Sequence, residues 1–150
     1  MSSDHPCFAL DARLAADCHT LAELELSQLL LMNNALLPWF ILVPRVSCDE
    51  LHQLTSDQLM ALFKEISLIS VFIKSHNPVD KLNTAAIGNI VRQLHIHIVG
   101  RQTTDPWWPG TVWGTSQRRA YNQNELNSIR HKLSMALPNS VPIRQPIAKA

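Results

Sequence analysis

Polar and apolar side chains alternate near the middle of the chain, in the order Gln93-Leu94-His95-Ile96-His97-Ile98-Val99. A period of two is typical of a β-strand, in which successive side chains project from opposite faces. We therefore predict a strand over Val91 to Val99, with its leucine and isoleucines facing a core. Two imidazoles would then lie about 6.6 Å apart along the other face, next to an amide.

A β-hairpin is predicted earlier in the chain. Trp39 to Val43 is a run of residues that favour strands, and Pro44 ends it. A leucine-rich opening segment ends in a second apolar run, Leu26 to Met32. The Asn33-Asn34 pair between the two runs is a turn signal, so we expect the runs to pair.

Two helices are predicted from capping and apolar spacing. Thr55 and Gln58 have the spacing of a capping box, and we expect the principal helix over Thr55 to Lys74, packed on a sheet. Asn122 begins a C-terminal helix that Pro138 ends. The expected buried stripes are Leu59, Leu62, Phe63, Ile66, Ile69 and Ile73 in the first helix and Leu126, Ile129, Leu133 and Leu137 in the second.

Shorter elements fill the gaps. Asp11 is placed to cap a helix over Ala12 to Cys18, and Ser47 to Glu50 has capping-box spacing for a short helix. Lys81 to Ala86 is expected to form a strand, and Gly88-Asn89 a turn.

The loop from Asp105 to Gly114 is punctuated by proline and glycine and holds three of the four tryptophans. Exposing these rings to water would be costly. We expect the loop to pack on its own domain, on a partner subunit or on a ligand.

Together these elements predict one α+β domain over residues 1–150. Its mainly antiparallel sheet would have about five strands, with the principal helix and the C-terminal helix packed against it. At 150 residues the chain is long enough for one substantial core. We expect that core over about residues 8–137, and a loosely held tail over residues 138–150.

Composition narrows the classes of partner. The 13 Lys and Arg residues nearly balance 12 Asp and Glu residues, so the net charge of +1 gives no electrostatic footprint for nucleic acid or a membrane surface. No secretory signal or membrane span is apparent, and we expect a cytoplasmic protein. The three cysteines, Cys7, Cys18 and Cys48, are odd in number and widely spaced, which favours reduced thiols.

The His95 and His97 pair allows three interpretations. The rings could belong to a partly exposed strand without chemistry. They could chelate zinc, although such a site needs a third protein ligand, and no CxxC, HExxH or carboxylate-rich segment flanks the strand. One ring could also act as a nucleophile while the other binds phosphate or transfers a proton.

The order of these elements resembles the histidine triad (HIT) family of nucleotide hydrolases and transferases. The family signature is His-φ-His-φ-His-φ-φ, with φ apolar, and Gln93 to Val99 matches two of its three histidines and all of its apolar positions. The resemblance extends over roughly Phe8 to Leu137 and looks strongest to bacterial members described as dinucleoside polyphosphate hydrolases. It implies a HIT-like fold and a homodimer.

The resemblance also implies roles for the signature residues. His95 matches the nucleophile that attacks the α-phosphorus of a nucleotide and forms a nucleotidyl-histidine. His97 matches the histidine that contacts the phosphate. Gln93 replaces the first histidine, so proton handling there is lost, while hydrogen bonding that orients a neighbour is kept.

Three asparagines match substrate-binding positions of the family. Asn34 stands where many members have an aspartate that holds the ribose hydroxyls, and an amide can still hydrogen-bond a diol. Asn83 matches a polar residue beside the phosphate, and Asn89 belongs to a turn that approaches the substrate. Ile90 departs from the pattern, because relatives often place a hydroxyl there.

The implied activity is cleavage of a nucleoside 5′-phosphoric anhydride or phosphoramidate, with release of a nucleoside monophosphate. A neutral imidazole is a competent nucleophile at neutral pH, and His97, Asn83, Asn89 and backbone N–H groups could stabilise phosphoryl charge, so no metal or cofactor is expected. Two alternatives stay open. One is a nucleotide-binding regulatory module with weak or no turnover, and the other is a metalloenzyme that uses both histidines and a distant third ligand.

The remaining histidines and a basic pair are expected to play no part in the site. We expect His5, His19, His52 and His131 to be solvated, and the Arg118-Arg119 pair to lie on a solvated face.

Overall fold

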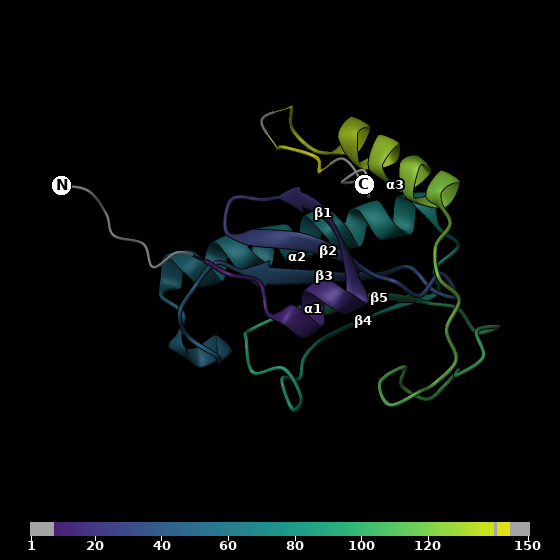
Figure 1. Ribbon diagram of the computed structural model, residues 1–150, viewed down its shortest axis with the longest axis horizontal. Coiled ribbons are helices and arrows are strands. Elements are labelled where there is room, and N and C mark those ends of the chain that lie inside the picture. The colour runs from purple at the N-terminus through teal and green to yellow at the C-terminus, as the bar shows by residue number, and fades with distance from the viewer. Residues whose placement is uncertain (1–7, 140, 145–150) are drawn as a thin grey trace.

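The computed structural model describes residues 8–139 and 141–144, and it shows an open five-stranded antiparallel sheet with helices on both faces (Figure 1). The strand order is β1-β2-β3-β5-β4. The strands are β1 (Cys18–Glu23), β2 (Ser27–Met32), β3 (Trp39–Pro44), β4 (Lys81–Ala86) and β5 (Ile96–Arg101). The helices are α1 (Ala12–Asp17), the 3-10 helix η1 (Leu51–Gln53), α2 (Ser56–His76) and α3 (Gln123–Ala136). The predicted α+β class is confirmed.

The predicted hairpin is formed by β2 and β3, which pair from Ser27 opposite Pro44 to Leu31 opposite Phe40. The sequence indicated only one strand before the Asn33-Asn34 turn, whereas the structure has two, because β1 also pairs with β2. The tight connection between β1 and β2 lacks glycine and proline, so it carries no turn signal.

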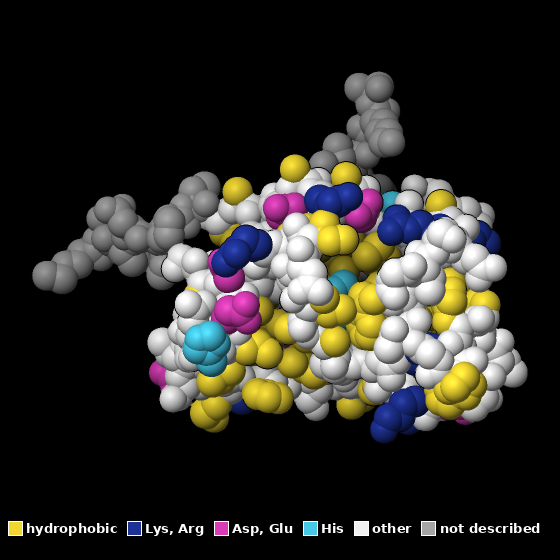
Figure 2. All heavy atoms as spheres, turned by 90° about the horizontal axis from the view of Figure 1, so that it is seen from below, with side chains coloured by type: hydrophobic (Ala, Val, Ile, Leu, Met, Phe, Trp, Pro, Cys, Tyr) yellow, Lys and Arg dark blue, Asp and Glu magenta, His cyan; other side chains and the backbone are white. Residues whose placement is uncertain are grey.

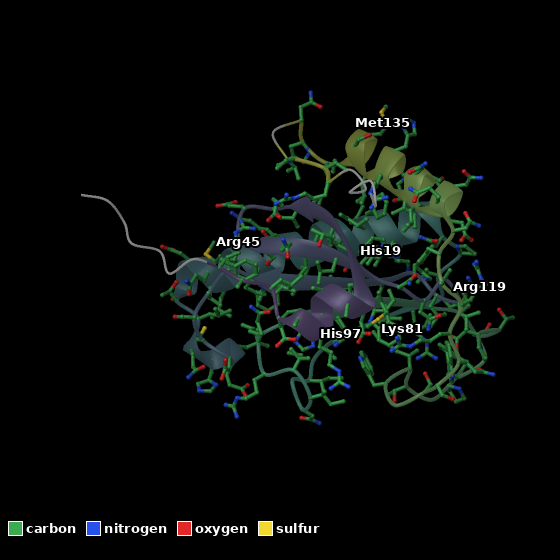
Figure 3. The ribbon with its side chains drawn as sticks, in the orientation of Figure 1. His19, Arg45, Lys81, His97, Arg119 and Met135 are labelled. Atoms are coloured by element: carbon green, nitrogen blue, oxygen red, sulfur yellow. The ribbon has the colours of Figure 1, made fainter. Side chains whose placement is uncertain are left out.

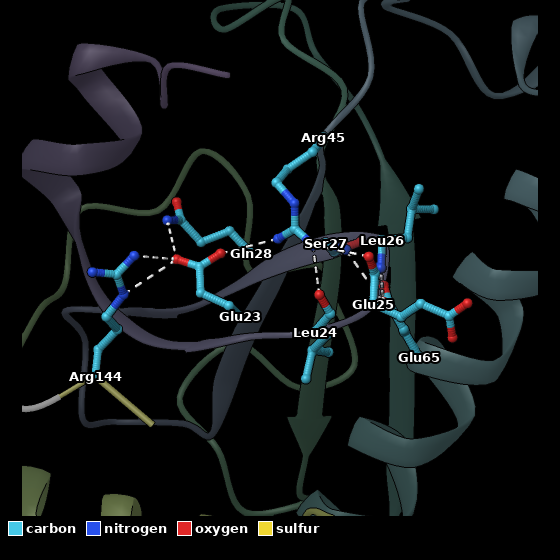
Figure 4. Close-up of polar contacts among 9 residues, drawn as sticks. All are labelled: Glu23, Leu24, Glu25, Leu26, Ser27, Gln28, Arg45, Glu65 and Arg144. Carbon is cyan, nitrogen blue, oxygen red and sulfur yellow. Dashed lines mark hydrogen bonds and ion pairs between the residues drawn. The ribbon is translucent and has the colours of Figure 1, made fainter. Parts of the chain in front are cut away.

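A buried carboxylate from α2 holds that connection instead. Oε1 of Glu65 accepts hydrogen bonds from the backbone N–H groups of Leu26 at 2.7 Å and Ser27 at 3.2 Å (Figure 4). Leu26 and Glu65 are 39 positions apart in the sequence. Local sequence could therefore not reveal the turn.

Helix α2 packs on one face of the sheet. Thr55 and Gln58 form the predicted capping box, and Leu62, Ile69 and Ile73 enter the main core as expected. Phe63 does not, since 67% of its surface is exposed. Phe72 lies in the core instead and meets Phe40 edge to face, with ring centroids 5.8 Å apart.

Helix α3 also begins as predicted, with the Asn122 side chain accepting a hydrogen bond from the backbone N–H of Glu125. Its side chains Leu126 and Leu133 are buried in the same core, together with Leu137.

The segment after α3 had been expected to be loosely held. Within it, residues 141–144 lie along β1, where the backbone N–H of Arg144 donates to Leu21 O at 2.7 Å and that of Glu23 donates to Pro142 O at 3.2 Å. Residues 140 and 145–150 of that segment lie outside the described residues.

The opposite face of the sheet carries a second buried cluster. Leu14 of α1 packs there with Trp39, Ile41 and Val99, and Trp107 and Trp113 of the tryptophan loop pack against the cluster. Asp11 caps α1 by accepting from the Arg13 backbone N–H, as predicted. The loop therefore packs on its own domain, which was one of the three expected placements.

The histidine strand begins later than predicted. β5 starts at Ile96, whereas residues 91–95 are irregular. Its partner β4 pairs from Lys81 opposite Arg101 to Ala86 opposite Ile96 and then turns away at Gly88, whose φ is +72°. The chain before Ile96 does not pair with β4, so it lies outside the sheet, and His95 precedes β5.

The predictions for the short helix and for the exposure of the other histidines are confirmed only in part. The short helix after β3 is capped by Glu50 with Gln53, and Ser47 is not its cap. His52 and His131 are exposed as expected, but His19 is only half-exposed, and its Nε2 is buried without a hydrogen-bond partner among the described residues.

Other expectations lie partly outside the described residues. Cys18 and Cys48 are free thiols, as expected, whereas His5 and Cys7 are not described. Of the helices in the described part of the chain, none combines the length and apolar character needed to cross a bilayer.

Gly100 provides a test of the packing between β5 and α2. A Cβ at this position would lie 2.7 Å from Pro38 and Val79 side-chain atoms and 2.9 Å from Ile73 Cγ2. We expect Gly100→Ala to lower the free energy of unfolding by about 1–3 kcal/mol through overpacking, as measured by urea denaturation. Thr84→Ala, an exposed substitution on the neighbouring strand, should change it by less than about 0.5 kcal/mol. Equal stability of the Gly100→Ala variant and the wild type would contradict this packing.

Candidate active site

His97 lies on β5 opposite Ile41 of β3, on the face of the sheet that carries α1 (Figure 3). Only 5% of its surface is exposed. Trp39 Nε1–H donates a hydrogen bond to His97 Nδ1 at 3.0 Å. Because an indole nitrogen is only a donor, Nδ1 must be the unprotonated nitrogen of the neutral ring. The proton of His97 therefore sits on Nε2, which is left to donate.

The electrostatic setting of His97 favours this neutral form. Burial, followed by the charge of the neighbouring His95, lowers the pKa of His97 from 6.5 to about 4. Burial disfavours the imidazolium because charge loses hydration. At neutral pH, His97 is thus a neutral hydrogen-bond donor.

His95 carries its proton on the other ring nitrogen. Its Nδ1 lies 2.7 Å from the backbone carbonyl oxygen of Gln93. A carbonyl only accepts, so Nδ1 holds the hydrogen, and in the neutral ring the lone pair is on Nε2. The two imidazole centroids are 4.9 Å apart at an interplanar angle of 69°. A ring with a lone pair on Nε2 and a ring with an N–H on Nε2 are therefore brought side by side.

Gln93 contributes to this arrangement through its backbone. Its side-chain oxygen accepts from Asp11 N–H at 2.8 Å, and its amide nitrogen donates to Ala9 O at 2.9 Å. The side chain thus fastens the segment that leads into α1. The side chain was expected to orient a neighbour, and the neighbours that it holds are residues 9 and 11, whereas His95 is held by the Gln93 carbonyl, which any residue at this position would supply.

A small cavity of about 130 Å³ opens beside His95. It is lined by the loop from Ala86 to Asn89, by Arg92 to His95 and, on the other wall, by Asp49 and Glu50. Figure 2 shows a histidine side chain at the bottom of a hollow on one face of the molecule, surrounded by hydrophobic side chains. Of the predicted binding asparagines, Asn89 lies in this cavity with His95.

Asn83 and Asn34 do not line that cavity. Asn83 Oδ1 accepts from Arg101 Nη1 at 2.9 Å. The Asn34 side chain is buried and holds residues 117–119, since its amide nitrogen donates to Gln117 O and its oxygen accepts from Arg119 N–H, both at 3.3 Å. Both side chains are therefore engaged in fixing neighbouring structure.

Arg101 organises the tryptophan loop, a role that sequence reasoning missed. Its guanidinium is buried and forms a two-pronged pair with Asp105, with Nε to Oδ2 at 2.8 Å and Nη2 to Oδ1 at 2.9 Å. Its Nη1 also donates to Gly110 O at 2.8 Å. The spacing of four residues between Arg101 and Asp105 was the only local signal for this pair.

The organised loop brings Trp113 against His97. The Trp113 ring meets His97 edge to face with centroids 5.5 Å apart, and it meets Trp39 at 6.2 Å. These aromatic rings cover His97 and contribute to its burial. Trp39 had been predicted only as part of a strand, and its indole N–H proves to set the tautomer of His97.

The described residues show no metal-binding constellation. Among residues 8–139 and 141–144, no group of three or more His, Cys, Asp and Glu side chains is placed to hold a metal ion. The third ligand that the metalloenzyme hypothesis requires is thus not found in that part of the chain.

Comparison with known proteins gives consistent results. The family model of the HIT domain matches residues 13–104. A histidine triad protein from Marinobacter aquaeolei VT8 is 44% identical, with a TM-score of 0.82, over 87% of this chain and 96% of that one. Histidine triad proteins from Bradyrhizobium japonicum and Sinorhizobium meliloti 1021 are 39% and 36% identical, each with a TM-score of 0.83 over 87% of this chain and 98% of theirs. No curated protein sequence matches the chain.

The low pKa of His97 predicts a pH dependence of stability. The unfolded ring protonates near pH 6.5 and the folded ring near pH 4, so the unfolded state binds more protons between these values. The free energy of unfolding should therefore fall by up to about 3 kcal/mol as the pH drops from 6.5 towards 4. Urea denaturation at several pH values in this range should show that the free energy of unfolding of His97→Gln depends less steeply on pH than that of the wild type. The exposed control His131→Gln should keep the wild-type slope, and an unchanged slope in His97→Gln would contradict the assignment.

Proposed function

The chain belongs to the HIT domain family, and from this premise we propose that it cleaves a nucleoside 5′-phosphoric anhydride or phosphoramidate through a nucleotidyl-histidine intermediate. The family consists generally of nucleotide-binding hydrolases and transferases. The observation that carries the proposal is the complementary protonation of the histidines. His95 offers a lone pair on Nε2, and His97 beside it offers an N–H.

In the first step, His95 Nε2 attacks the α-phosphorus. The N–P bond forms while the bond to the leaving group breaks, and the leaving group departs with the electron pair. Positive charge then develops on the imidazole, where Nδ1–H is held by the Gln93 carbonyl at 2.7 Å. A carbonyl aimed at this N–H stabilises the developing charge and needs no rearrangement.

In the second step, water attacks the phosphorus from the side opposite His95. The P–N bond breaks, the electron pair returns to Nε2, the attacking water releases a proton to the solvent, and a nucleoside monophosphate leaves. Through both steps, Nε2–H of the neutral His97 donates to a phosphoryl oxygen. Asn89, which lines the cavity beside His95, supplies a second polar contact through its side chain.

We assign Asn34 and Asn83 supporting roles in this reaction. Asn83 fixes the Arg101 cluster, and Asn34 fixes residues 117–119. The Asn34 amide has two N–H donors and one of them donates to Gln117 O, which leaves the second for a ribose contact of the kind that the family pattern implies.

A dinucleoside polyphosphate is the substrate that the resemblance of the sequence favours, and a cytoplasmic homodimer is the expected form of the protein. The competing function is a nucleotide-binding module with weak turnover, since Ile90 leaves an apolar, largely exposed side chain where relatives often have a hydroxyl. Incubation of the purified protein with adenosine and guanosine dinucleotides and phosphoramidates, followed by assay of monophosphate release, separates the two functions.

Removal of the nucleophile is the first test. We expect His95→Ala to abolish turnover while nucleotide affinity stays within about tenfold, because the substitution removes the reacting nitrogen and few ground-state contacts. Monophosphate release and calorimetric titration would measure the two quantities. His131→Ala, which changes an exposed histidine, should keep wild-type turnover.

The intermediate itself can be trapped. Rapid quenching with labelled nucleotide should give an acid-labile, base-stable phosphoramidate on His95, and prolonged chelation should leave the activity intact. Undiminished turnover in His95→Ala would refute the nucleophile. Loss of activity on chelation that zinc restores, without an adduct, would favour the metalloenzyme.

Position 93 offers a separate test. Gln93→Ala keeps the carbonyl that orients His95 but removes both side-chain bonds to residues 9 and 11. We expect the rate of the chemical step to stay within about threefold, while hydrogen exchange at the Asp11 N–H accelerates by about tenfold or more, in line with a lost hydrogen bond of about 1 kcal/mol or somewhat more. A large loss of rate with unchanged exchange would show that the side chain itself acts on the substrate.

A further inference from the structure

Arg92 is an arginine that the proposed reaction leaves unused. It lines the cavity beside His95, and among the described lining residues it is the one Lys or Arg. Its side chain is 84% exposed. The buried Arg101 of β5 is different, because its guanidinium is fully occupied by Asp105, Asn83 and Gly110.

The partner of Arg92 is a single carboxylate oxygen on the opposite wall. Both Nε, at 3.3 Å, and Nη2, at 3.2 Å, donate to Asp49 Oδ2. Two long bonds to one oxygen lack the parallel, two-oxygen geometry of the Arg101 pair. The Asp49 side chain is itself 44% exposed, and ion pairs of this kind contribute little to stability. Arg92 can therefore leave Asp49 at low cost.

A phosphate or phosphonate is a better acceptor for this guanidinium than Asp49 as it is placed. Its oxygens carry more charge and match the planar fork of arginine in a bidentate manner. The other acidic residue of the cavity, Glu50, stands at the N-terminus of η1, where its backbone N–H donates to Gln53 Oε1 at 3.1 Å, and the printed bonds of Arg92 run to Asp49 alone among the described residues. An anionic group that enters the cavity thus meets one cation that is free to move and one carboxylate that competes for it.

We propose that Arg92 exchanges Asp49 for an anionic group attached beyond the α-phosphate, so that this pair selects substrates with a charged leaving group. The inference rests on the proposed function, because it takes the α-phosphate to lie at His95. It makes Arg92 a specificity-determining residue and Asp49 its competitor. Substrates whose leaving group is neutral gain nothing from the exchange.

The test compares two ligands that differ only in that outer group. AMP ends at the α-phosphate, whereas adenosine 5′-(α,β-methylene)diphosphate adds a phosphonate through a bridge that the enzyme cannot cleave. The corresponding guanosine pair covers the other purine. We expect calorimetry on the full chain to show that the diphosphate analogue binds about tenfold more tightly than the monophosphate, as one charge-assisted contact would produce.

Variants then assign the difference. Arg92→Gln should reduce the affinity ratio to within about twofold of one and leave monophosphate binding unchanged. Asp49→Asn should raise the ratio, because the competitor is lost. Arg144→Gln is the matched control. It removes another exposed arginine that is paired to a glutamate, Glu23, away from the cavity (Figure 4), and it should keep the wild-type ratio.

The outcomes separate the inference from its premise. Equal affinity of the wild type for both ligands, or an unchanged ratio in Arg92→Gln, would overturn the role of Arg92. An unchanged ratio in Asp49→Asn would overturn the competition by Asp49. If neither purine monophosphate nor its analogue binds the wild type, the proposed nucleotide site itself is wrong and the inference falls with it.

Discussion

Burying two imidazoles side by side is the constraint on which the rest of the site depends. Each ring loses hydration, and a buried polar nitrogen without a partner is costly. The structure meets this cost with one donor and one acceptor, the indole of Trp39 for His97 and the carbonyl of Gln93 for His95. Because these partners have opposite character, the two neutral rings must hold their protons on opposite nitrogens, which is the difference that the proposed reaction uses.

The remaining architecture serves to keep those partners in place. The register between β3 and β5 sets Trp39 opposite Val99, from where its indole reaches His97. The buried Arg101 fixes the loop that lays Trp113 over the same histidine. Such a buried ion pair is costly unless it is fully hydrogen-bonded, and Asp105 and the Gly110 carbonyl meet that requirement. The charged cluster at the end of β5 thus holds the loop whose Trp113 packs against His97.

Sequence periodicity predicted the parts of this fold that depend on neighbours along the chain. The capping box at Thr55, the hairpin around Asn33-Asn34 and the alternation through His95 and His97 are all local patterns, and their positions were recovered. The tight turn after β1 was missed because Glu65 reaches it from α2. The predicted strand through His95 began too early, because the start of β5 depends on where β4 turns away.

The site likewise combines residues that are close in sequence with residues that only the fold brings together. The histidine pair and Asn89 lie within eight positions of one another along the chain, so their proximity follows from local sequence. Asn34 and Asn83 were grouped with them by resemblance, yet their amides bond to Arg119 and Arg101, which only the folded chain brings near. Trp39 and Arg101 were not singled out at all, because a tryptophan in a strand and an arginine at its end are unremarkable until their partners are known.

Gln93 stands at the first position of the signature, and its side-chain amide has a structural role there. It binds one backbone acceptor and one backbone donor at once, across 84 and 82 positions of sequence. A histidine ring cannot take both partners in that arrangement, because its two nitrogens point in different directions. The position therefore has an architectural role, and a histidine placed there would leave the start of α1 without this fastening.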